Sequence, residues 1–105
     1  MAWVEYESSF MSSKRFKYKS MDEARKMAIQ IIEDDYTKKK QFHKSTVFIY
    51  GSETGQKSIG NVHGLLGADY KPKDYIWQYT DKDGRLNERY IDPHTGKAER
   101  NGRRY

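Results

Sequence analysis

Only one segment of this 105-residue chain has the periodicity of an amphipathic helix, which narrows the possible folds sharply. Ser20 and Glu23 form a capping box, in which each side chain can satisfy a backbone N–H of the first turn. Apolar residues then form one stripe at helical spacing: Met21, Ala24, Met27, Ala28, Ile31 and Ile32. Residues 33–35 are acidic, and negative side chains are unfavourable near the negative, C-terminal end of a helix dipole. The helix should therefore fray or end near them.

In the rest of the sequence, apolar and polar residues alternate as they do in β-strands. Strands are predicted over residues 3–10, 14–18, 46–50, 58–63, 75–80 and 85–91. Asp83-Gly84 indicates a hairpin turn, residues 92–96 indicate a second turn, and residues 64–74 are predicted to form a loop. The fold class is therefore α+β, in the order β-β-α-β-β-β-β, with one helix packed on an antiparallel or mixed sheet of about five to seven strands.

Large aliphatic side chains are scarce, so the core must draw on aromatic residues. Leu, Ile, Val and Phe together make up 17 of the 105 residues, while there are 9 Tyr and 2 Trp. The expected core comprises Phe16, Tyr18, Ala24, Met27, Ala28, Ile31, Val47, Ile49, Ile59 and Val62. A buried charge there, as in Ile31→Asp, is expected to unfold the protein. Residues 1–92 are predicted to form a single domain, and residues 93–105 a basic, flexible segment.

Several classes of function lack their sequence signals. The chain has no Cys, which excludes a disulfide framework, a Cys-ligated zinc ion and a thiol nucleophile. His43, His63 and His94 fall in separate segments without ligand spacing, so neither a metal nor another cofactor is expected. Hydrolysis at His63 with a nearby acid is a minor alternative to a non-enzymatic protein. No signal peptide or long apolar run is present, which favours the cytoplasm and no membrane partner.

The distribution of charge indicates a polyanionic partner. The formal net charge is +5, and the excess of basic residues falls after residue 35. Lysine and arginine contacts to phosphates give nucleic-acid affinity that does not depend on sequence. The predicted nucleic-acid-binding residues are Lys38, Lys39, Lys40, Lys44, Arg85, Arg89, Arg100, Arg103 and Arg104. The alternative is that these runs serve only solubility.

Tyr75, Trp77 and Tyr79 share one strand face and flank this basic region. Such rings can stack on single-stranded bases, although an aliphatic-poor chain also needs them in its core. The sequence thus favours a small nucleic-acid-binding module. The alternative is an adaptor or inhibitor that binds another protein through a sheet edge or through a loop at Leu65-Leu66. In size and charge the chain resembles accessory proteins of phages and other mobile elements, although no motif carries that likeness.

Overall fold

The computed structural model describes residues 2–6, 15–39, 46–66 and 72–101. These residues form one helix, α1 (Met21–Lys39), and seven strands. The strands are β1 (Ala2–Tyr6), β2 (Arg15–Tyr18), β3 (Thr46–Tyr50), β4 (Ser58–Leu66), β5 (Pro72–Thr80), β6 (Leu86–Ile91) and β7 (Ala98–Asn101). The predicted α+β class and the predicted size of the sheet are confirmed. Residues 7–10 of the first predicted strand lie outside the described ranges.

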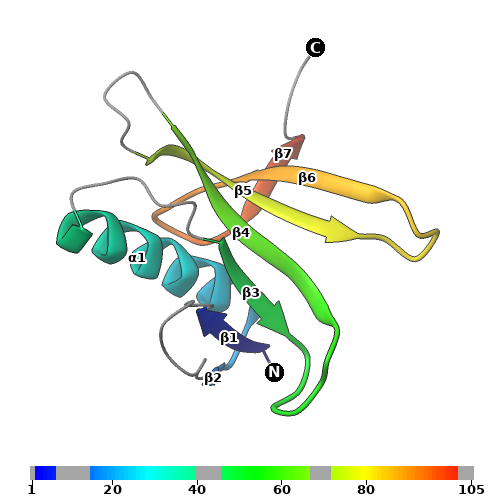
Figure 1. Cartoon of the computed structure of the whole chain (residues 1–105). Coiled ribbons are helices and arrows are strands. Elements are labelled where there is room, and N and C mark those ends of the chain that lie inside the picture. The colour runs from blue at the N-terminus through cyan, green and yellow to red at the C-terminus, as the bar shows by residue number, and fades with distance from the viewer. Residues whose placement is uncertain (1, 7–14, 40–45, 67–71, 102–105) are drawn as a thin grey trace.

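All seven strands belong to one sheet, in the order β2-β1-β3-β4-β5-β6-β7, and every neighbouring pair is antiparallel. α1 lies across one face of this sheet (Figure 1). The register between β4 and β5 runs from Gly60↔Tyr79 to Leu66↔Pro72. Strands β5, β6 and β7 therefore continue the same sheet that β1 to β4 form.

The core lies between α1 and the face of the sheet that it covers. Ala24, Ala28, Ile29 and Ile32 of the helix are buried against strand residues that include Val4 and Val62. Ser20 caps the helix as predicted, because its Oγ accepts a hydrogen bond from the Glu23 backbone N–H at 3.2 Å. Within the described ranges, no helix is both long and apolar enough to span a membrane.

Two residues predicted for the core are exposed. Phe16 has 52% of its surface accessible and Ile59 has 42%. Phe16 belongs to β2, an edge strand of the sheet, where only one side of the strand is paired, and Ile59 stands near the start of β4. Ile31 is only partly buried, whereas Ile32 is 1% exposed. The buried stripe therefore keeps Ala24, Ala28 and Ile32 of the predicted one but is turned toward Ile29 and away from Ile31.

The Leu65-Leu66 pair does not lie in a loop. Both residues belong to β4, where Leu65 pairs with Asp74 and Leu66 with Pro72 across a register shift. Gly and Pro suggested a loop over 64–74, but a proline is tolerated at the first position of a strand, which Pro72 occupies. The proposed docking loop at these leucines is thus corrected to a hairpin of β4 and β5.

A strand also forms beyond residue 92. Residues 98–101 form β7, in which Ala98 pairs with Ile91. The preceding turn contacts the start of α1, because Arg25 Nε donates to the Gly96 carbonyl at 2.7 Å. Arg25 is 8% exposed, pairs with Asp22 and lies over the Trp77 ring at 5.4 Å. Burial lowers the pKa of Arg25, although the Asp22 carboxylate opposes this shift. This contact fixes the β6–β7 turn to the helix.

The Asp83-Gly84 hairpin turn depends on the carboxylate of Asp81. Its Oδ1 accepts from the Asp83 and Arg85 backbone N–H groups at 2.9 and 3.0 Å, and Oδ2 accepts from Asn87 at 2.8 Å. These hydrogen bonds, led by the one from the Arg85 backbone, hold the pKa of Asp81 below its ordinary value.

We expect Asp81 to stabilise the fold above its unfolded-state pKa. Because the folded-state pKa is the lower one, this contribution is lost as the pH falls through the folded-state value. Asp81→Asn should therefore melt below the wild type at about pH 6, and the gap should narrow toward about pH 3. Thermal melts across this range test the linkage. A gap independent of pH would contradict it.

Candidate functional site

Among the described residues, α1 covers one face of the sheet and no element covers the other. Side chains alternate along a strand, so the neighbours of the core residues Val4, Ile49, Val62 and Trp77 point to the uncovered side. The strand register aligns these neighbours across six strands. We call this surface the open sheet face; it comprises Trp3, Glu5, Arg15, Lys17, Phe48, Tyr50, Asn61, His63, Ile76, Gln78, Glu88 and Tyr90.

A row of hydrogen-bonded polar side chains crosses the centre of the open sheet face. Asn61 Nδ2 donates to Gln78 Oε1 at 3.3 Å, and Gln78 Nε2 donates to Glu88 Oε1 at 3.2 Å. Asn61 Oδ1 lies 3.3 Å from His63 Nδ1. The row therefore joins side chains of β4, β5 and β6, all partly buried.

The carboxylate at one end of this row sets the direction of every hydrogen bond in it. An ionised Glu88 can only accept, so the Gln78 amide must donate to it and turn its carbonyl toward Asn61. Asn61 then donates to Gln78 and presents its carbonyl to His63, whose Nδ1 donates to it in the tautomer that carries a proton there. Each amide uses one of its two N–H groups within the row. The row is thus an ordered set of hydrogen-bonding groups on a rigid sheet.

Aromatic and apolar side chains border the polar row. Phe48 pairs with Asn61 from β3, and Tyr90 pairs with Ile76 from β6. Both rings are partly buried, whereas Ile76 is fully buried although it lies outside the core cluster under α1. A ligand on this surface would therefore meet aromatic side chains and amide groups together.

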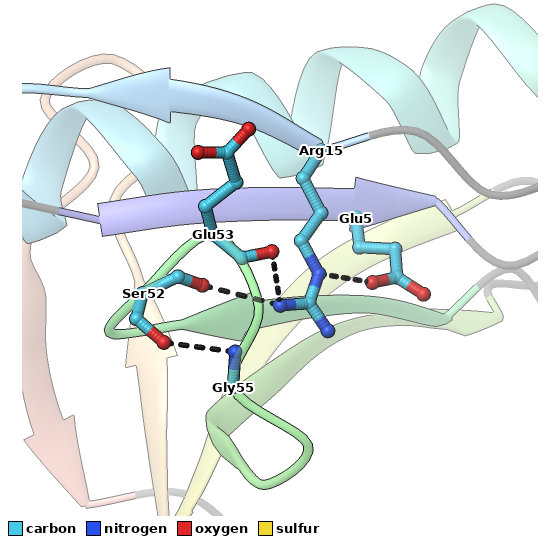
Figure 2. Close-up of polar contacts among 5 residues, drawn as sticks. All are labelled: Glu5, Arg15, Ser52, Glu53 and Gly55. Atoms are coloured by element: carbon cyan, nitrogen blue, oxygen red, sulfur yellow. Dashed lines mark hydrogen bonds and ion pairs between the residues drawn. The ribbon is translucent and has the colours of Figure 1, made fainter.

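Arg15 fixes one margin of the open sheet face (Figure 2). Its Nε donates to Glu5 Oε2 at 2.6 Å, and its Nη1 donates to the Ser52 and Glu53 carbonyls at 3.1 and 2.7 Å. The guanidinium also lies 3.6 Å from the centroid of the Tyr50 ring. The hydrogen bond to Glu5 raises the pKa of Arg15, so its charge is held at the β3–β4 turn.

A second cation stands beside an aromatic ring at the same margin. Lys17 Nζ lies 5.8 Å from the centroid of the Trp3 ring, and the Lys17 side chain is exposed. Lys17 pairs with Trp3 across β1 and β2. Because the charge of Arg15 is matched by Glu5, Lys17 is the cation here that a phosphate can reach most directly.

The structure distributes the predicted basic residues over several elements. Lys38 and Lys39 end α1, whereas Arg85 is exposed in the β5–β6 turn, and Figure 1 shows these two places at opposite sides of the molecule. Arg89 pairs with Asn101 and lies on the face shared with Trp77, so Arg89 is not part of the open sheet face. Arg100 is in β7, paired with Tyr90. Lys40, Lys44, Arg103 and Arg104 lie outside the described residues.

The predicted aromatic strand face belongs to the core. Tyr75 and Trp77 are each 5% exposed, and Trp77 stacks with Tyr79 at 6.0 Å between ring centroids. Tyr75 Oη donates to Glu33 Oε1 at 2.9 Å; burial first, and then this hydrogen bond, raise the pKa of Tyr75. These rings position α1, and the rings accessible to a ligand are those of the open sheet face.

Comparison with known proteins found no match to a family model, to a curated protein or to a solved structure. The candidate site therefore rests on the geometry of this chain. Within the described ranges, no three His, Asp or Glu side chains come together in a group that could hold a metal ion.

The residues of the polar row were not predicted as a site. Asn61 and Gln78 are far apart in sequence and carry no motif, and only the β4–β5 register brings them together. The alternation of residues in 75–80 was a usable signal, because placing Tyr75, Trp77 and Tyr79 in the core turns Gln78 outward.

Proposed function

We propose that this protein is a non-enzymatic module that binds single-stranded nucleic acid on the open sheet face. The observation that carries the proposal is the row of Asn61, Gln78 and Glu88 bordered by the partly exposed rings of Phe48 and Tyr90. Aromatic rings on a sheet stack on bases that are not paired in a duplex, and amide groups between them can hydrogen-bond to base edges.

Electrostatics supports the same kind of ligand. The formal net charge of +5 attracts a polyanion at low salt. Lys17 at the β2 margin and Arg85 in the β5–β6 turn are both exposed and would contact phosphates on either side of the stacked bases. Arg100 lies in β7 and pairs with Tyr90 of β6, and Arg103 and Arg104 follow it in the sequence. In this proposal the phosphate contacts provide affinity and the open sheet face selects unpaired bases.

The proposal predicts that binding depends on the Phe48 ring. Phe48→Leu keeps an apolar side chain of similar size but removes the flat ring, so it should lose about 1–3 kcal/mol of stacking, or roughly 5- to 150-fold in affinity. Phe16→Leu makes the same change on the helix-side face and should leave affinity unchanged. Fluorescence anisotropy with a labelled single-stranded oligonucleotide, compared with its duplex, measures both effects.

The salt dependence of the affinity distinguishes contacts to phosphates from nonspecific adsorption of the labelled probe. Several phosphate contacts should weaken wild-type affinity by roughly tenfold or more between about 50 and 200 mM salt. The duplex should bind more weakly than the single strand, since its bases are not free to stack. The proposal is overturned by a wild-type protein that binds neither probe at the lower salt, or by Phe48→Leu and Phe16→Leu variants that bind alike.

A further inference from the structure

We propose a second binding site at the β2 edge of the sheet, where an extended segment of another protein adds as a strand. The segment would alternate apolar residues with Asp or Glu. This site borders the open sheet face and shares Arg15 and Lys17 with it, but the argument for it does not depend on the nucleic-acid proposal. Three observations support it: the position of β2, a cavity beside α1, and the charges of the strand.

The first observation is that β2 is an outermost strand. It pairs with β1 on one side only, so its other side presents backbone N–H and C=O groups without a strand partner among the described residues. A row of such groups is a template for an added strand. Lysines on the edge strand of a sheet often prevent unwanted pairing with other chains. Phe16 in the middle of β2 is nevertheless 52% exposed, and this protective role of lysine does not explain an exposed aromatic side chain.

The second observation is a cavity of about 280 Å³ between β2 and α1. It is lined by Tyr18 of β2 and by Glu23, Lys26, Met27 and Gln30 of the helix. Tyr18 and Phe16 share the helix-side face of β2, since they stand two positions apart. Every second side chain of an added strand would lie beside these two rings, and apolar ones would be buried there.

The third observation is charge, and it identifies the occupant. The remaining side chains of the added strand would lie beside Arg15 and Lys17 on the opposite face. Arg15 is matched by Glu5, but Lys17 and Lys19 are exposed and their charge favours acidic neighbours. A second copy of the chain is disfavoured, because two β2 edges would bring lysines and arginines against one another. The fitting partner is therefore an extended segment of alternating apolar and acidic residues.

A labelled eight-residue peptide that alternates Val with Glu tests this site by fluorescence anisotropy on the intact protein. Phe16→Ser removes the exposed ring and should weaken binding by about tenfold or more. Leu86→Ser is the matched control, because Leu86 is 64% exposed in β6 and should not affect binding. Lys17→Glu should also weaken binding, whereas Lys82→Glu, which makes the same charge change in the β5–β6 turn, should change it much less. Circular dichroism checks that each variant is folded.

Two further peptides define the specificity. A peptide alternating Val with Lys should not bind, and a peptide with four Val followed by four Glu should bind more weakly, because only alternation suits both faces of a strand. The proposal is overturned if the Val–Glu peptide does not bind, if the Val–Lys peptide binds equally well, or if Phe16→Ser has no effect. A concentration-dependent dimer that Phe16→Ser abolishes would also overturn it, because the edge would then belong to a second copy.

Discussion

The Ile32→Asp variant is expected to be unfolded at neutral pH. Ile32 is 1% exposed and lies in the cluster that α1 forms with the sheet. An aspartate there would leave a carboxylate in the core without a partner, which costs about 3–5 kcal/mol or more, and would also leave part of the isoleucine volume unfilled. Small domains are stable by only about 5–15 kcal/mol, and this one has few aliphatic residues to compensate. Circular dichroism and a urea titration measure the loss.

Two variants in the same helix make this experiment specific. Lys26→Asp introduces the same residue at an exposed position of α1 and should remain folded. Ile31→Asp should be destabilised to an intermediate degree, because Ile31 is only partly buried. If the Ile32→Asp and Lys26→Asp variants had the same melting temperature, the buried face of the helix would be wrongly assigned.

The behaviour of α1 shows how far local sequence determines this fold. The capping box placed the start of the helix within one residue, because a cap depends only on neighbouring atoms. The centre of its buried stripe was displaced, since Ile29 and Arg25 are buried by contacts from distant strands. Arg25 in particular is buried only because the β6–β7 turn and Trp77 lie against it, and no periodicity predicts that.

The candidate site was harder to predict from the sequence than the fold was. Runs of lysine and arginine are visible in sequence, but the fold distributes their described members over the end of α1, the β5–β6 turn, β6 and β7. The polar row is invisible in sequence, because Asn61, Gln78 and Glu88 become neighbours only through two strand registers. Strand alternation predicts which residues share a face, whereas register decides which of them meet.

Gly96→Ala is expected to lower stability far more than Gly84→Ala, although both glycines have nearly the same backbone conformation. Their φ angles are +79° and +78°, so alanine meets the same left-handed strain at each, about 1–2 kcal/mol. A Cβ at Gly84 would touch nothing within 4 Å. A Cβ at Gly96 would lie 1.9 Å from the Asp22 carbonyl oxygen of α1, so the turn and the helix would have to separate.

That separation would also disturb the hydrogen bond from Arg25 to the Gly96 carbonyl and leave a buried cation with fewer partners. We therefore expect Gly96→Ala to lose at least about 2 kcal/mol more than Gly84→Ala, which in a domain of this size is a difference of roughly 8 °C or more in Tm. Thermal melts of the two variants measure it directly. Equal melting temperatures would show that the β6–β7 turn does not hold α1. A large difference would show that β7 belongs to the folded unit, because its turn then stabilises the helix that covers the core.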